Sequence, residues 1–247
     1  MNSMPSIFGI PFSNCTKNQA LNRLDELLSN ARRTKRAAFI AFINAHCMNI
    51  AYKDSQYTAI LREQADAVWP DGIGIKMAGK LLGFNVPDNV NGTDFFPMIC
   101  QKNYSIFMLG AAPGVAQRAI ENASAQFPNP NFIGASHGYF SEEYTEEMAI
   151  KQINAAKPDI LLVGLGVPRQ EKWIAAHRDA LDCGVVIAVG GLLDFISGRI
   201  PRAPLWMRKH GMEWCYRLYQ EPVRLFKRYV IGNPLFLMRV LKEKYKR

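Results

Sequence analysis

Asp71 lies in the stretch "VWPDGIG", directly after the apolar residues Val68 and Trp69, where a strand is expected to end and a helix to begin. A carboxylate at the carboxyl end of a strand can serve as a general base that takes a proton from a hydroxyl group. Asp is also a favoured residue at helix N-caps, so capping of the helix that opens after Gly72 accounts for the same position. The residues alone leave both interpretations open.

Two asparagines hold comparable positions. Asn44 ends the apolar run "AAFIAFIN" and is suited to hydrogen bonding a base or a sugar, or to capping the following helix. In "NVNGTDFFP", Asn91 and the glycine after it are a turn signal, and Thr93 or Asp94 then begins a helix. Turn and cap explain this second stretch without any ligand.

The stretch "GLGVPRQEKW" joins a glycine-rich strand exit to a helix. Backbone N–H groups at Gly164 and Gly166 would suit a phosphate or a uracil-like edge. Gln170 and Glu171 fall in the first helical turn, where capping is the alternative to ligand binding.

A second glycine pair, Gly190 and Gly191 in "VGGLLDF", offers another backbone cradle. The sequence has no GxxxxGK[ST], no GxSxG and no Asp-x-Asp, and Met77 stands where a dinucleotide fingerprint after Gly72 and Gly74 needs glycine. Its five cysteines and four histidines show no metal-ligand spacing, so we expect no metal site, no cofactor and no disulfide framework.

Elements that must position these residues are visible as apolar runs alternating with helical patterns. Near-continuous apolar runs are typical of parallel strands that are covered on both faces. The alternation predicts a doubly wound α/β domain over residues 1–198, with a mostly parallel sheet and helices on both faces. The expected strands lie within 37–44, 104–111, 132–140, 159–166 and 184–191, with a short one ending at Trp69.

Residues 199–247 differ in charge and pattern. They hold 13 Lys or Arg and three Glu, a net charge of +10, whereas the remaining residues hold 17 Lys or Arg against 18 Asp or Glu. We expect a basic helical appendage that meets an anionic partner. In "EPVRLFKRYV", a pattern typical of membrane interfaces places Leu225, Phe226, Tyr229 and Val230 opposite the basic residues. Aromatic residues suited to an interface extend to Phe236.

The N-terminus has no basic region followed by an apolar core, so no signal peptide is expected. No apolar run approaches the length of a membrane span. Together with the scattered cysteines, this predicts a protein of the reducing cytoplasm.

With these residues in place, the chain resembles the WecG/TagA/CpsF family of glycosyltransferases, the N-acetylmannosaminyltransferase-like enzymes. The resemblance covers almost the whole chain and depends on six elements in order. These elements are "INA" at 43–45, "PDGIGI" at 70–75, "NGTDFF" at 91–96, "FMLGA" at 107–111, "GLGVPRQEKW" at 164–173 and "VGGLLDFISGRIPRAPLWMRKHGMEWCYRLYQEP" at 189–222.

The resemblance implies inverting, metal-independent transfer from a UDP-sugar to a polyprenyl-diphosphate-linked sugar in bacterial cell-surface polysaccharide synthesis. The enzyme would attach peripherally to the anionic cytoplasmic face of the inner membrane through its C-terminal segment. Asp71 would be the general base, and Asn44 and Gln170 would line the nucleotide-sugar site. The other strand-end candidates would bind substrate, and appendage arginines would close over the diphosphate, with Arg202, Arg208, Arg217 and Arg224 as candidates.

Two positions depart from the pattern of some family members. Phe42 stands where some have threonine, and Asn89 stands where some have arginine. The donor is therefore left open among N-acetylmannosamine, its uronic acid and glucose. The acceptor glycan and the formation of a homo-oligomer are also open.

Two other classes of function compete with this interpretation. A nucleotide-sugar oxidoreductase or epimerase needs a dinucleotide fingerprint, which the sequence lacks. A non-enzymatic α/β module could use the basic tail on nucleic acid, but no recognised nucleic-acid motif is present, so we expect no such partner.

Overall fold

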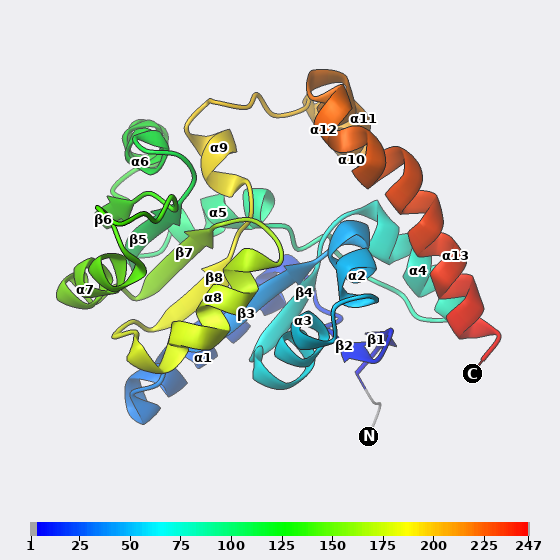
Figure 1. Cartoon of the computed structure of the whole chain (residues 1–247), viewed down its shortest axis with the longest axis horizontal. Helices are drawn as coiled ribbons and strands as arrows, with labels where there is room; N and C mark the ends of the chain where they lie inside the picture. The colour runs from blue at the N-terminus through cyan, green and yellow to red at the C-terminus, as the bar shows by residue number, and fades with distance from the viewer. Residues whose placement is uncertain (1–3, 247) are drawn as a thin grey trace.

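The computed structural model describes residues 4–246, and its centre is a six-stranded parallel sheet (Figure 1). The strands are β3 (Ala38–Ile43), β4 (Ala67–Pro70), β5 (Ser105–Gly110), β6 (Asn131–Ser136), β7 (Ile160–Gly164) and β8 (Val185–Ala188). Their order across the sheet is β4-β3-β8-β7-β5-β6. The sequence analysis did not predict the short antiparallel hairpin of β1 (Ser6–Ile7) and β2 (Ile10–Pro11).

Helices connect the strands and cover the sheet. They are α1 (Lys17–Thr34), α2 (Ala45–Ala51), α3 (Ser55–Ala59), α4 (Ile73–Leu82), α5 (Gly92–Cys100), α6 (Val115–Gln126), α7 (Glu146–Ala156), α8 (Arg169–His177), α9 (Leu192–Ile196), α10 (Leu205–Lys209), α11 (Glu213–Gln220), α12 (Pro222–Phe226) and α13 (Gly232–Lys244). Two π-helical turns, η1 (Ile60–Gln64) and η3 (Lys227–Ile231), and the 3₁₀ turn η2 (Arg178–Ala180) complete the helical structure.

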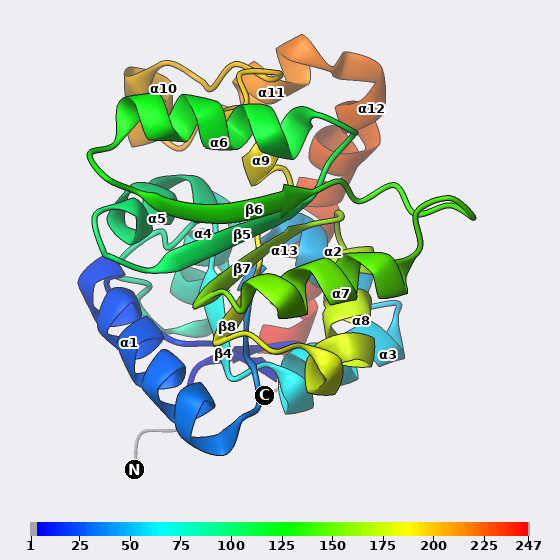
Figure 2. The same ribbon diagram turned by 90° about the vertical axis from the view of Figure 1, so that its left-hand side faces the viewer.

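The two faces of the sheet bury two separate apolar clusters. Phe39, Ala41 and Ile43 of β3 enter one cluster, and the alternate residues Ile40 and Phe42 enter the other, as the period of a strand requires. The first cluster includes residues of α2, α4, α7, α8 and α13, and the second includes residues of α1, α5, α6 and α9 (Figure 2). The predicted doubly wound α/β architecture is confirmed.

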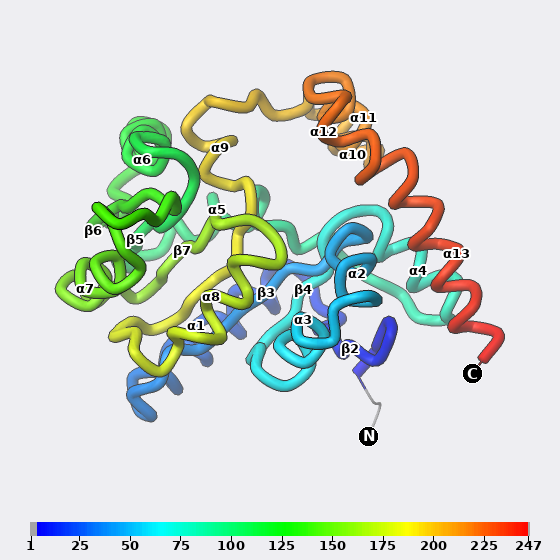
Figure 3. Tube along the Cα trace, viewed as in Figure 1, coloured from blue at the N-terminus to red at the C-terminus, as the bar shows by residue number. Residues whose placement is uncertain are grey.

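After α9 the described chain contains helices only, and it crosses from one half of the molecule to the other before descending as α13 (Figure 3). The expected division at 198/199 therefore marks a change of architecture. It does not mark a separate core, because Phe236 and Val240 of α13 are fully buried in the first cluster. Residues 1–3 and 247 of the two expected segments lie outside the described residues.

Burial also changes the expected interfacial pattern. Leu225 is 2% exposed and Phe236 is fully buried, whereas Phe226 and Val230 face solvent. The expectation that all of these residues form one exposed face is therefore wrong for Leu225 and Phe236. In α13, one apolar side packs against α2 and α4, and another apolar side is exposed. Within residues 4–246, no helix combines the length and hydropathy that crossing a membrane requires.

Phe236→Ala should lower the free energy of unfolding by about 3–5 kcal/mol, because it removes a fully buried ring that contacts Phe8 edge-on. Met238→Ala is the matched control on the same helix. Met238 is 59% exposed, so its loss should change stability by no more than about 0.5 kcal/mol. Denaturant unfolding measures both. Equal effects would show that α13 is not part of the core.

Candidate active site

A cleft of about 1560 Å³ lies at the carboxyl ends of the strands, between the sheet and the appendage. Ligands of open α/β sheets bind at this edge. The cleft brings together most of the residues that the sequence analysis singled out: Asn44, Asp71, Asn91, Thr93, Gly164, Gly166, Gln170, Gly190, Gly191, Arg208, Arg217 and Arg224. Asp94, Glu171 and Arg202 do not belong to its lining.

Asp71 and Asn44 meet because of strand register. Ile43 pairs with Pro70 in the parallel ladder of β3 and β4, so the residues that follow each of them emerge opposite one another. The Asp71 N–H donates to the Ile43 carbonyl at 2.8 Å, and Asn44 Nδ2 donates to Asp71 Oδ2 at 3.1 Å. The amide thus fixes the direction of the carboxylate.

The corner after Asp71 tests the capping interpretation. Gly72 is the N-cap of α4, with φ of 85°, and no side chain caps this helix. The Gly72 N–H donates to Asn89 Oδ1 at 2.5 Å instead. Asp71 is therefore not the cap, and its carboxylate faces the cleft. Asn44, in contrast, does cap α2, since its Oδ1 accepts from the N–H groups of His46 and Cys47.

The electrostatic surroundings of Asp71 favour a basic carboxylate. Burial raises its pKa above the usual 3.8, and the charge of Glu213 acts in the same direction. The Asn44 hydrogen bond and the charges of Arg228 and Arg217 oppose this rise in the pKa. A carboxylate with a raised pKa accepts a proton more readily than an ordinary aspartate does.

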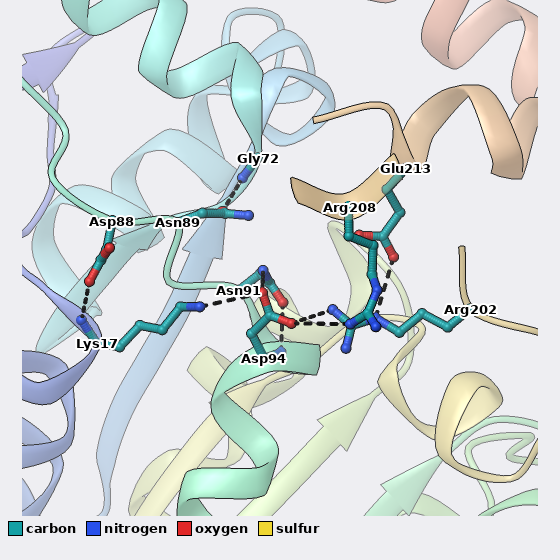
Figure 4. A network of polar contacts seen from close by, with 9 residues as sticks. All are labelled: Lys17, Gly72, Asp88, Asn89, Asn91, Asp94, Arg202, Arg208 and Glu213. Carbon is teal, nitrogen blue, oxygen red and sulfur yellow. Dashed lines mark hydrogen bonds and ion pairs between the residues drawn. The ribbon is translucent and has the colours of Figure 1, made fainter. Parts of the chain in front are cut away.

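Asn91 and Asp94 form a polar junction between the sheet and the appendage (Figure 4). Asn91 Oδ1 caps α5 by accepting the Asp94 N–H at 2.8 Å. This stretch therefore does contain a helix cap, but the helix begins at Gly92 and not at Thr93 or Asp94 as expected. The Asp94 carboxylate pairs with Arg202, with Lys17 at 3.5 Å and with Arg208 at 3.9 Å. Burial by itself raises the pKa of Asp94, but Arg202, Asn91 and Lys17 together hold this pKa below its usual value.

Gln170 ties two glycine loops together. Its Oε1 accepts the Gly190 N–H at 2.9 Å, and its Nε2 donates to Glu171 Oε1 at 2.9 Å. Glu171 is fully buried, and burial raises its pKa to about 7. The structure thus places Gln170 at the cleft wall and Glu171 directly behind it, where the carboxylate orients the amide.

Close packing of the strand ends requires glycine. A Cβ at Gly164 would lie 2.8 Å from the Gly190 carbonyl oxygen, closer than real Cβ atoms approach an oxygen. Gly166 and Gly190 have φ of 80° and 57°, which favours glycine. The two loops therefore form the tight backbone lining that the sequence predicts at this edge.

Arginines from the appendage form the opposite wall. The buried Nε atoms of Arg208, Arg217 and Arg228 have no hydrogen-bond partner in residues 4–246. The guanidinium group of Arg217 lies over the Phe195 ring at 5.1 Å. Donors that are buried and unpaired are costly, so this wall is suited to an anion.

Among the lining residues that the sequence did not predict for this cleft, Arg228 and His46 carry the most chemistry. Arg228 was assigned to the basic side of the interfacial pattern in "EPVRLFKRYV", although it follows Arg224 by four residues, the spacing that places both on one side of a helix. His46 also lines the cleft. Burial, together with the charge of Arg228, lowers its pKa to about 4, so its imidazole is neutral near pH 7.

The sequence profile of the glycosyl transferase WecG/TagA/CpsF family matches residues 5–247. The chain belongs to this family. Individual relatives agree with the profile. The chain is 32% identical to the N-acetylglucosaminyldiphosphoundecaprenol N-acetyl-beta-D-mannosaminyltransferase of Bacillus subtilis (strain 168), over 96% of this chain and 91% of that enzyme.

Enzymes of the same name from Bacillus spizizenii (strain ATCC 23059 / NRRL B-14472 / W23) and Staphylococcus aureus (strain MW2) are also similar. The first is 35% identical over 84% of this chain and 80% of its own length, and the second is 30% identical over 97% and 93%. The resemblance noted in the sequence is confirmed, and this WecG/TagA/CpsF-family protein is a glycosyltransferase. Its cleft is the candidate active site.

Asn44→Ser should raise the pKa of Asp71 further. Serine keeps the cap of α2 but is too short to reach Asp71, so the ionised carboxylate loses the hydrogen bond that stabilises it. Titration of the Asp71 carboxyl carbon by NMR measures the change. A pKa that stays the same or falls would contradict the geometry, provided that the thermal unfolding of the variant remains close to that of the parent protein.

Proposed function

We propose that this glycosyltransferase transfers a sugar from a UDP-sugar to a hydroxyl group of a polyprenyl-diphosphate-linked sugar, with inversion at the anomeric carbon. The observation that carries the proposal is the Asp71 carboxylate, which does not cap α4 and lies in the cleft opposite a wall of arginines. The names of the relatives describe N-acetylmannosamine transfer to an undecaprenyl-diphosphate-linked N-acetylglucosamine. They support the acceptor class and favour N-acetylmannosamine among the three candidate donors.

In this mechanism Asp71 removes the proton of the acceptor hydroxyl. The oxygen then forms a bond to the anomeric carbon as the bond between that carbon and the diphosphate oxygen breaks, and UDP departs. A single displacement of this kind inverts the anomeric centre, through a state related to the oxocarbenium ion of glycoside cleavage. The raised pKa of Asp71 suits the proton transfer.

The donor would lie across the glycine loops. Backbone groups of the Gly164–Gly166 and Gly190–Gly191 loops, held together by Gln170, provide a preorganised lining for the nucleotide. Arg208, Arg217, Arg224 and Arg228 would face the diphosphate, and Arg202 would support Arg208 through their shared partner Asp94. Guanidinium groups suit this role because their planar donors match phosphate oxygens.

The acceptor is lipid-linked, so we also propose peripheral attachment to the cytoplasmic face of the bacterial inner membrane. The outer side of α12 to α13 supports this. It exposes an apolar stripe consisting of Val223, Phe226, Val230, Ile231, Met238, Leu241 and Tyr245. The exposed residues Lys227 and Lys244 accompany the stripe. Apolar side chains with neighbouring lysines are typical of segments that lie in a membrane interface.

Family membership favours this interpretation over the oxidoreductase or epimerase and over a nucleic-acid module. The positive charge of the appendage has a structural explanation in the cleft wall and the outer stripe, so a nucleic-acid partner is not needed to account for it.

Asp71→Asn should abolish most of the activity while the fold is kept. The Asp71 backbone bond to Ile43 and the glycine cap of α4 do not involve the carboxylate. Loss of a general base should lower turnover by roughly 10²–10⁴-fold. UDP release with a soluble diphosphate-linked acceptor measures this, and Asp179→Asn, at an exposed carboxylate paired with Arg36, is the control. Turnover near that of the parent enzyme would refute the role of Asp71.

Charge on the departing UDP should be neutralised by arginine and not by a metal ion. Excess chelator should therefore leave the rate nearly unchanged, whereas Arg217→Gln should lower turnover by roughly 10–100-fold, the effect of losing one charged hydrogen-bond donor of about 1.5–3 kcal/mol. Arg33→Gln on the outer face of α1 is the control. A rate that chelator abolishes and Mg²⁺ or Mn²⁺ restores would overturn this assignment.

A further inference from the structure

A second cleft, of about 580 Å³, lies beside the last turns of α13. Its walls come from the β1–β2 hairpin, the α2–α3 segment and the last turns of α13, near the C-terminus in Figure 1. None of its lining residues also lines the cleft that contains Asp71. It is thus a separate feature that the transfer reaction does not use.

Cations dominate this second cleft. Its lining includes five basic side chains and one carboxylate, which belong to Lys53, Arg62, Arg239, Lys242, Lys246 and Glu243. Glu243 accepts the Phe8 N–H at 3.1 Å, and Arg62 pairs with Glu63. Within residues 4–246, Lys53, Lys242 and Lys246 form no ion pair with any carboxylate. Like charges gathered in a cleft repel one another, so an anion that binds among them lowers the free energy.

Arg239 is held ready for such an anion. Its Nη1 donates to Asn49 Oδ1 at 2.7 Å and to the Asn49 carbonyl at 3.2 Å. The guanidinium carbon lies 4.2 Å from the centre of the Tyr52 ring, and Tyr52 packs edge-on against Phe8. The described bonds involve one nitrogen only, and the fixed plane directs the remaining donors without a further loss of side-chain entropy.

The position of this cleft indicates which anion it takes. Met238 and Leu241 of α13, and Tyr245 directly after it, are exposed. Each is followed in the chain by a basic residue of the cleft, namely Arg239, Lys242 and Lys246. The proposed membrane-facing stripe and the basic wall are therefore adjacent sides of one helix. If the phosphate of a phospholipid bound at the basic wall, its acyl chains would lie beside the apolar stripe. A phospholipid in a membrane leaflet has this arrangement of headgroup and chains.

We propose that this second cleft binds the phosphate headgroup of an anionic phospholipid, with Arg239, Lys242, Lys246 and Lys53 as its ligands. The site extends the membrane attachment given under Proposed function and depends on it for its biological use. Binding of a single lipid molecule in water, however, does not require attachment to a bilayer. The two ideas can thus fail separately.

The test measures binding of a short-chain phosphatidylglycerol below its micelle concentration, by calorimetry on the full chain. The cleft variant combines Lys53→Gln, Lys242→Gln and Lys246→Gln, which spares Arg239 and the packing of Tyr52. The control variant combines Lys35→Gln, Lys80→Gln and Lys151→Gln, which removes equal charge from exposed positions outside both clefts and outside the appendage. Short-chain phosphatidylcholine and inorganic phosphate are the comparison ligands.

We expect the parent protein and the control variant to bind the anionic lipid equally, and the cleft variant to bind it roughly 100-fold more weakly. Phosphatidylcholine and inorganic phosphate should bind at least tenfold more weakly than the anionic lipid. Equal losses in the two variants, equal binding of phosphatidylcholine, or absence of binding to the parent protein would overturn the site. Inorganic phosphate that binds as tightly as the lipid would show that the cleft takes free phosphate instead.

Sedimentation with anionic vesicles separates this proposal from membrane attachment itself. Parent protein that pellets, with both variants equally weakened, would retain attachment and refute a dedicated headgroup site. Parent protein that remains in solution while it still binds the monomeric lipid would refute attachment and retain the site. Neither variant should change transfer to a soluble acceptor, since neither touches the cleft that contains Asp71.

Discussion

The parallel pairing of β3 with β4 is the constraint on which the candidate active site depends. Because Ile43 pairs with Pro70, the chain must place Asn44 beside Asp71 as both strands end. The Asp71 N–H donates to the Ile43 carbonyl, and Gly72 is the N-cap of α4. These two features leave the carboxylate with one amide partner and an open side toward the cleft. A general base needs this combination of fixed direction and access.

The remaining chemistry is divided between the sheet and the appendage. The sheet supplies the carboxylate and the glycine loops, which are rigid because neighbouring strands hold them. The appendage supplies cations, and two kinds of contact fix its position. Phe236 enters the core of the α/β domain, and Arg202 pairs with Asp94 at the start of α5. The arginine wall is therefore held in place by the same fold that positions Asp71.

Much of this arrangement was predictable from sequence, for identifiable reasons. Each expected strand is present, and Asn44, Asp71 and Gly164 lie at strand ends because apolar runs in a parallel sheet stop where the chain reaches solvent. The sequence did not predict which side of the last helices is buried and which is exposed. Apolar residues lie on both the inner and outer sides of α13, and periodicity does not tell which side meets the core. Phe236 was misplaced for that reason.

Electrostatics connects the sites of the two proposals. An appendage with a charge of +10 would repel itself unless its cations were distributed and partly neutralised. Asp94 and Glu213 partly neutralise the arginines at the cleft that contains Asp71, while unpaired Nε atoms remain there as donors for an anion. At the second cleft the Glu243 carboxylate accepts the Phe8 N–H. Lys53, Lys242 and Lys246 there have no acidic partner in residues 4–246. Each concentration of positive charge thus lies where a bound anion would neutralise it, which is the physical basis of both proposals.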